Sequence, residues 1–498
     1  MADRPPAGPA PSGPLLLHDA RLPGAAEPLD VLVDGGVVAA VGPAATAAAG
    51  RARPVPLDGR WLLPGLWDEH VHFTQWALMR RRLDVAAADS AAAAAAMVRD
   101  HLAATPPTAE PLVGYGFRDG LWADDPTVPL LDGASGERPV VLVSADLHCL
   151  WLNSAARAVF GVAATHDAVL REDAAFAVTG RLTEVPDTVV DRWAAEAAEA
   201  AAARGVVGVV DLEMTWNPPV WARRVAAGLR SLRVETGTYP ADLDRALAVG
   251  LRTGDPVAGG DGLITVGPFK ILIDGSLNTR TACCRHPYPD GTTGWLTVPP
   301  DELLTLLRRA VDGGLLPAVH AIGDAAAGVA LDTFAQLGSG GRIEHAQLVD
   351  AADLPRFAAL GVVASMQPEH AMDDRDVADR HWAGRTGDAF PVGALWRAGA
   401  RLAFGSDAPV SPLDPWRGIA AAVSRSRDGL PAWHPEQGIP VTAALDASSR
   451  GGRVAPGRPA DLVVVDRDPL GCTDVELRTM PVTATLLAGR LTAGELPG

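Results

Sequence analysis

Two histidines separated by one residue, His70 and His72, are the first residues of this chain whose types and spacing suggest chemistry. They follow an apolar run at 61–67, and such a run bounded by polar residues predicts a buried strand. Side chains two residues apart on a strand point to the same side. Two adjacent imidazoles can supply the first two ligands of a divalent metal. A histidine pair that binds no metal would show the same pattern, so other residues of the chain must distinguish the two possibilities.

Further residues of metal-ligand type stand near the ends of later apolar runs, just before predicted loops. On the face of a parallel barrel formed by the carboxyl ends of the strands, such residues build active sites. Each residue alone is typical of a polar group satisfied in the core, but that explanation would need to hold six times in one chain. We therefore expect these residues to converge with the histidine pair on one site: Lys270, His320, His345 and Asp407.

Eight apolar runs are candidate barrel strands, and most are separated by stretches of helical character that are rich in Ala, Leu and Arg. Strands that alternate with helices predict parallel βα units. The predicted fold class is therefore α/β, with a TIM-like (β/α)8 barrel at 62–455. Its expected strands lie at 62–72, 206–213, 231–239, 264–274, 315–322, 342–348, 361–367 and 401–407.

Other segments lie outside this repeat. Residues 15–61 and 456–498 contain short strand-like runs joined by tight turns, and Asp34-Gly35-Gly36 is a strong hairpin signal. A segment of about 73–204 separates the first two barrel strands, and so long an insertion is usually a lid or an accessory subdomain. Residues 1–14 are rich in Pro, Ala and Gly and lack the features of a signal peptide, so we expect a disordered tail.

The order of these motifs resembles the amidohydrolase superfamily of metal-dependent hydrolases, and in detail amidohydrolase family 3, the branch of enzymes like N-substituted formamide deformylase. The resemblance covers about residues 15–490, and it is specific for the branch but weak on substrate. The matching segments are 64–72, 270–276, 320–324, 342–347, 365–368, 405–410 and 460–466.

The resemblance implies a metal site and a reaction. His70, His72, His320, His345 and Asp407 would be the ligands, and a carboxylated Lys270 would bridge two metals. Asp407 would also be the general base in hydrolysis of a non-peptide C–N bond (amide, formamide or cyclic amide) by a metal-activated water. The terminal strands would pair into a small composite β-sandwich.

Imidazole and carboxylate ligands suit Zn²⁺, with Mn²⁺, Fe²⁺ or Co²⁺ as substitutes. For Lys270 the alternative to a carbamate is a salt bridge to Asp274 or Glu344. The family's Asp-x-His signature in the insertion corresponds to 146–148. We therefore expect substrate contacts from the insertion, with His148, Tyr115 and Trp122 as candidates.

Two other classes of function stay open. A relative that kept the fold without catalysis would be a binding or scaffold protein, although the complete set of ligand-type residues argues against it. A metal-dependent isomerase or decarboxylase would keep the same ligands, and product identification separates it from a hydrolase.

Charge and cysteine content narrow the partners. The net charge of −17 argues against a nucleic acid or an anionic membrane, and no apolar run is long enough to span a bilayer. The four cysteines suit neither a zinc knuckle nor a disulfide framework, which favours a reduced, cytoplasmic protein. We expect a small-molecule substrate, with a homodimer as an open option.

The chain departs from the family pattern in one place. The segment 446–458, between a predicted helix and the last strands, is abbreviated, although Gly457 is kept. This puts in doubt the helix that closes the barrel but not the metal site.

Overall fold

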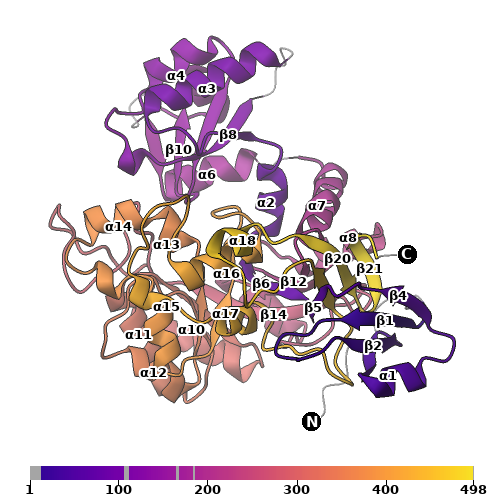
Figure 1. Ribbon diagram of the computed structural model, residues 1–498. Coiled ribbons are helices and arrows are strands. Elements are labelled where there is room, and N and C mark those ends of the chain that lie inside the picture. The colour runs from indigo at the N-terminus through magenta and orange to yellow at the C-terminus, as the bar shows by residue number, and fades with distance from the viewer. Residues whose placement is uncertain (1–12, 106–110, 164–167, 183–184, 497–498) are drawn as a thin grey trace.

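The computed structural model describes residues 13–105, 111–163, 168–182 and 185–496. Most of the predicted tail at 1–14 lies outside these residues. Figure 1 shows a barrel, a body at the top made from the insertion, and a body at the lower right where the first and last strands meet.

The barrel is an eight-stranded parallel sheet, as predicted. Its first and last strands approach each other at their carboxyl ends, where His72 N donates to Ala408 O at 2.8 Å and Asp407 N donates to His70 O at 2.7 Å. These bonds nearly close the barrel and draw two of the predicted ligand segments together. In order around the sheet the strands are β6 (Leu66–Val71), β12 (Val206–Asp211), β13 (Arg233–Thr238), β14 (Ile264–Leu272), β15 (Pro317–Ala321), β16 (Arg342–His345), β17 (Val363–Met366) and β18 (Leu402–Phe404).

Helices alternate with these strands and cover the outside of the barrel. In α10 (Pro300–Asp312), Leu303, Leu307 and Ala310 recur at helical spacing and are buried, so one face of the helix packs on the sheet. The other main barrel helices are α7 (Asp187–Ala202), α8 (Pro218–Ala226), α9 (Leu243–Ala248), α11 (Asp324–Leu337), α12 (Leu354–Leu360), α15 (Val392–Arg397), α16 (Pro415–Ser424) and α17 (Val441–Ser448).

The abbreviated segment does not leave the barrel without its last helix. Helix α17 contacts both β18 and β6, and Ala444 and Leu445 belong to the main hydrophobic core. The shortening is confined to the connection that follows, in which Arg450 contacts Glu69 and Glu235.

The expected first barrel strand at 62–72 is wrong in its first part. Residues Trp61–Pro64 form β5, which pairs antiparallel with β19 (Leu462–Val465) in another sheet. The chain changes sheets at Gly65, where any Cβ atom would collide with the side chain of Val207. One continuous apolar run therefore contributes a strand to the sandwich and a strand to the barrel, and apolarity alone cannot show where the first strand ends and the second begins.

Two four-stranded sheets face each other as a β-sandwich beside the barrel. Both ends of the chain contribute to its core, in which Leu17, Val33, Leu62, Val464 and Leu486 pack together. One sheet has the order β3 (Val37–Val41), β2 (Leu29–Asp34), β1 (Leu15–Ala20), β4 (Arg53–Pro56), and the other has β21 (Arg490–Gly494), β20 (Val482–Leu487), β19, β5.

The insertion forms a body with its own sheet and core. After α2 (Phe73–Met79), its helix α3 (Ala91–Ala104) begins where the side chain of Ser90 caps Ala93 N. Phe117, Trp122 and Trp151 pack together in the core. The sheet order is β11 (Val169–Arg171), β10 (Cys149–Leu152), β9 (Val140–Ser144), β8 (Leu112–Phe117), β7 (Leu83–Asp84), and the other helices are α4 (Val128–Ser135), α5 (Ser154–Phe160) and α6 (Asp173–Leu182).

The insertion is tied to the carboxyl end of the barrel. Asn278 Nδ2 donates to Asp146 Oδ2 at 3.0 Å, and Arg118 Nη2 lies 3.3 Å from Asp373 Oδ1. Both barrel partners follow the carboxyl ends of strands, so the insertion covers the mouth of the barrel.

Across the described ranges, no helix is long and apolar enough to cross a membrane. The four cysteines carry free thiols.

Candidate metal centre

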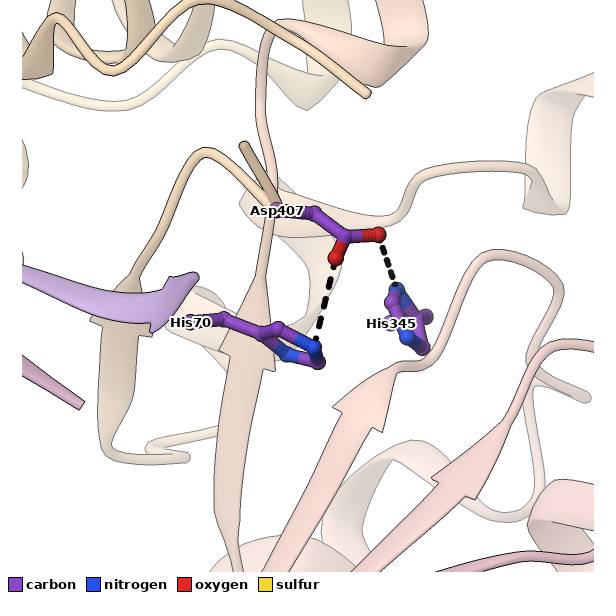
Figure 2. Close-up of side chains that lie close together, drawn as sticks. All are labelled: His70, His345 and Asp407. Carbon is purple, nitrogen blue, oxygen red and sulfur yellow. Dashed lines mark ion pairs between the residues drawn. The ribbon is translucent and has the colours of Figure 1, made fainter. Parts of the chain in front are cut away.

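Three side chains of ligand type meet at the carboxyl ends of the barrel strands. His70 lies on β6, His345 ends β16, and Asp407 follows β18. One ligand atom from each lies within 4.8 Å of the other two. Figure 2 shows the carboxylate of Asp407 between the two imidazoles, with Oδ1 at 3.4 Å from His70 Nε2 and Oδ2 at 4.0 Å from His345 Nδ1.

The other three predicted residues border this group. His72 Nε2 lies 3.4 Å from Asp407 Oδ1, and Lys270 Nζ lies 3.5 Å from His70 Nε2. The imidazole of His320 lies 4.5 Å from that of His345, measured between ring centroids. The fold therefore brings together residues that are far apart in the sequence.

The backbone at two of these positions adopts a left-handed conformation that non-glycine residues rarely take. His345 has φ of 75° and Asp407 has φ of 56°. Such conformations cost about 1–3 kcal/mol each and cluster at functional sites. At His345 the turn has a direct effect, because consecutive strand residues normally point to opposite faces. Here Glu344 and His345 both reach His70.

Electrostatics keep three of the imidazoles, those of His70, His320 and His345, in the neutral form that binds metals. The fourth differs, because the Asp407 carboxylate raises the pKa of His72 although burial opposes it. Burial, reinforced by the charge of Lys270, lowers the pKa of His70 to about 4 and that of His320 to about 3. Burial and the neighbouring His320 hold the pKa of His345 well below its usual range. Burial also lowers the pKa of Lys270 to about 8, which makes a neutral amine accessible near physiological pH.

Asp407 stays ionised in the same surroundings. Burial alone would raise the pKa of Asp407, but the facing imidazoles of His70, His72 and His345 hold it well below its usual range. Neutral imidazoles beside an ionised carboxylate form a donor set of the kind that binds Zn²⁺.

Two buried atoms of this group have no hydrogen-bond partner among the described residues: His72 Nδ1 and Asp407 Oδ1. Buried polar atoms in proteins are nearly always paired. Within the described chain, Asp407 Oδ1 makes only its two 3.4 Å contacts with imidazole nitrogens, and together with the donor types this fits a divalent metal.

Two further residues hold the imidazoles: Glu344, which the sequence suggested only as a salt-bridge partner of Lys270, and Gln367, to which it assigned no role. His70 Nδ1 donates to Glu344 Oε2 at 2.8 Å, and His345 Nδ1 donates to Gln367 Oε1 at 2.9 Å. Each bond uses Nδ1 of its histidine, and Nε2 of His70 faces Lys270 and Asp407 instead. Glu344 and Gln367 both lie within motifs that match the family, but only the folded barrel, in which Glu344 reaches His70 and β16 pairs with β17, shows their partners.

A second pair without an assigned role lies beside His345. The ring of His370 is nearly parallel to that of His345, with centroids 6.3 Å apart, and Gln347 Nε2 lies 3.5 Å from His370 Nδ1. Both residues are buried, yet Gln347 Oε1 and His370 Nε2 have no hydrogen-bond partner in the part of the chain that the structure describes.

Of the three substrate-contact candidates, His148 lies nearest the site. Its Nδ1 donates to Glu172 Oε2 at 2.8 Å, and this contact raises the pKa of His148 although burial opposes it. The charge of His148 in turn helps to lower the pKa of His320.

Tyr115 and Trp122 are placed inside the insertion. Trp122 packs in its core and donates Nε1–H to Ala88 O at 3.2 Å, while Tyr115 sits on β8 opposite Val143. No described contact joins either residue to the metal-type residues. Substrate contact by these two stays a prediction without support from the site.

Comparison with known proteins finds relatives that match most of the chain. Protein LONG AFTER FAR-RED 3 of Arabidopsis thaliana is 28% identical over 462 residues, covering 82% of this chain and 79% of that protein. N-substituted formamide deformylase of Arthrobacter pascens is 26% identical over 515 residues, covering 93% and 94% respectively.

A crystal structure of an uncharacterised metal-dependent hydrolase from Pyrococcus horikoshii OT3 has the same fold. Its TM-score is 0.78 at 24% identity, and the match covers 93% of this chain and 99% of that one. The model of the amidohydrolase family matches residues 55–493, which include every residue of the site. The chain therefore belongs to the amidohydrolase family.

Proposed function

We propose that this protein is a metal-dependent hydrolase that cleaves a non-peptide C–N bond in a small molecule, such as an amide, a formamide or a cyclic amide. The observation that carries the proposal is the buried convergence of His70, His345 and Asp407. Membership of the amidohydrolase family supports hydrolysis, and the similarity to a formamide deformylase supports a C–N bond as the target.

His70, His72, His320, His345 and Asp407 would hold the metal, for which Zn²⁺ is our first candidate. A bound divalent metal supplies Lewis acidity, which polarises the substrate carbonyl and lowers the pKa of water.

Asp407 is the proposed general base. Its carboxylate is ionised, and one oxygen accepts no hydrogen bond from the described residues, so it can accept a proton from the attacking water. The same group can then deliver that proton to the leaving nitrogen, which leaves as a neutral amine.

Lys270 is the proposed bridging residue, as a carbamate. Its side chain is only 2% exposed, and no carboxylate oxygen of the described chain lies within 4.0 Å of Nζ, so the alternative salt bridges to Asp274 and Glu344 are not formed. A neutral amine attacks carbon dioxide to form an N–C bond, and loss of one proton gives a carbamate with two oxygen ligands. The lowered pKa of Lys270 favours this reaction.

The residues that surround the metal-type group are proposed to bind the substrate. His148 enters from the insertion and is oriented by Glu172. Gln347 and His370 offer hydrogen-bonding atoms that the protein itself leaves unpaired. This combination suits a neutral polar group beside the scissile bond.

The test combines metal analysis with product identification. Protein purified without chelator should contain zinc or a related metal, and a panel of small amides, N-substituted formamides and cyclic amides should yield an amine and a carboxylate. Metal-loaded protein that hydrolyses none of them would favour the non-catalytic alternative. Turnover without hydrolysis products would favour the isomerase or decarboxylase.

A further inference from the structure

A network of hydrogen bonds and ion pairs runs from the site into the barrel. His70 Nδ1 donates to Glu344 Oε2 at 2.8 Å, and Arg342 Nε donates to Glu344 Oε1, also at 2.8 Å. Arg342 Nη1 donates to Glu69 Oε2 at 2.8 Å, and Glu69 Oε1 accepts from Arg450. Five residues from three separate parts of the sequence are thus linked in series.

The middle of this network is buried and fully paired. Glu344 is 0% exposed, Glu69 3% and Arg342 6%. Arg342 Nη2 also donates to Glu69 O at 2.8 Å and to Ser365 Oγ at 2.9 Å, so every nitrogen of its guanidinium is engaged. Buried ion pairs are poor sources of stability compared with apolar packing of the same volume. A role other than stability is therefore the better explanation for this network.

The far end of this network, at Arg450, lies on the opposite face of the barrel from the site. Arg450 stacks on Trp67, with its guanidinium carbon 3.5 Å from the ring centroid, and also pairs with Glu235. It borders a cavity of about 450 Å³ that Arg342 and Val363, the first residues of β16 and β17, also line. Arg450 belongs to the abbreviated segment after α17, for which the sequence suggested no role.

We propose that Glu344 is a positioning residue for His70, and that Arg342, Glu69 and Arg450 hold Glu344 from the other face of the barrel. The inference rests on the proposed metal site. By accepting the Nδ1 proton, Glu344 fixes the tautomer in which Nε2 of His70 carries the free lone pair, and it makes that nitrogen a stronger ligand. Arg342 prevents the carboxylate from rotating away, because it binds the other oxygen.

The experiment measures Zn²⁺ affinity by competition with a chromophoric chelator, without any substrate. Glu344→Gln should weaken Zn²⁺ binding by about 10–100-fold, as loss of such a partner does in other metal proteins. Arg450→Gln should weaken it in the same direction by a smaller factor. Arg453→Gln is the matched control: it lies in the same segment and pairs with Asp446 at the surface, and its affinity should equal that of the wild type.

A second measurement separates positioning from general support of the fold. In a His70→Ala background, Glu344→Gln should cause no further loss of Zn²⁺ affinity, because its partner is gone. An additional loss in the double variant would overturn the inference. So would a folded Glu344→Gln protein with wild-type affinity. If Glu344→Gln does not fold, Arg450→Gln decides, and a wild-type affinity in that variant would overturn the inference.

Failure of the proposed function has a different signature. Wild-type protein that binds Zn²⁺, responds to Glu344→Gln as expected and hydrolyses no C–N bond would contradict the hydrolase and leave the positioning role intact. Wild-type protein that binds no divalent metal would overturn both.

Discussion

Arg342 and Asp407 are buried charges inside the same barrel, but their surroundings differ. Every nitrogen of the Arg342 guanidinium donates a hydrogen bond within the protein. Asp407 has an oxygen with no hydrogen-bond partner in the described chain, and so does Gln347 nearby. A buried group left unpaired costs about 1–3 kcal/mol. Unpaired buried groups therefore lie at the carboxyl ends of the strands, where a ligand would bind. The buried charges around Arg342, by contrast, are paired within the protein.

The largest expected effect is on turnover by Asp407→Asn. The amide keeps the size of the side chain but cannot accept the proton, so kcat should fall by about 10²–10⁴-fold, with the larger value if metal is also lost. Steady-state kinetics and metal analysis on the same sample provide the check. A variant that keeps its metal and turns over within a few-fold of the wild type would show that Asp407 is not the base.

Lys270→Ala tests the bridging role. Loss of a direct ligand should reduce activity by more than the roughly 10–100-fold typical of an outer partner. Short carboxylic acids should restore part of the activity, since they can occupy the place of the carbamate. Intact mass spectrometry or density for a carboxylated lysine gives a second readout. Full activity of Lys270→Ala in a protein with two metals would rule the bridge out.

The stability of metal-free protein tests the contrast between Arg342 and Gln347 directly. Arg342→Met leaves Glu69 and Glu344 buried without their partner and should lower the free energy of unfolding by about 3–5 kcal/mol. Gln347→Leu removes a group that the folded protein leaves largely unpaired, so the change should be within about 1 kcal/mol. Urea denaturation with a linear extrapolation measures both. Equal losses of unfolding free energy in the two variants would contradict the difference between Arg342 and Gln347.

Gln347→Leu should instead weaken the binding of the substrate. The loss of one neutral hydrogen bond corresponds to about 0.5–1.5 kcal/mol, or roughly a 3–10-fold rise in KM with kcat little changed. Trp151→Phe is the control, because Trp151 is fully buried in the core of the insertion and is not a candidate for substrate contact. An unchanged KM for Gln347→Leu, measured on a substrate that the wild type hydrolyses, would exclude Gln347 from the binding site.

A pH dependence of stability is expected from Lys270. Its pKa is lowered from 10.5 to about 8 in the metal-free fold, so between pH 8 and 10.5 the unfolded chain binds more protons at this residue. Stability contributed by Lys270 therefore rises with pH in that window and is lost below it. The Lys270→Met variant should lack this rise. Parallel urea titrations of the two proteins from pH 7.5 to 10.5 provide the test, as groups common to both cancel.

The sequence alone was enough for the barrel and for the six residues that meet at its mouth. Parallel strands have their carboxyl ends on one face, so the six residues could be grouped without knowing any distance: His70, His72, Lys270, His320, His345 and Asp407. The alternation of strands and helices along the sequence likewise indicated the fold class. These features depend on local pattern and chain order, which a sequence displays.

Tertiary structure decided the rest. The division of the first apolar run at Gly65 depends on the close approach of Val207. The contact between Glu344 and His70 depends on the folding of the barrel, which brings together side chains 274 residues apart in the sequence, and on the left-handed turn at His345. Trp122 packs in the core of the insertion, a placement that its residue type does not reveal. Contacts between distant segments, and the backbone geometry that permits them, are set by packing of the whole chain, and no local pattern carries that information.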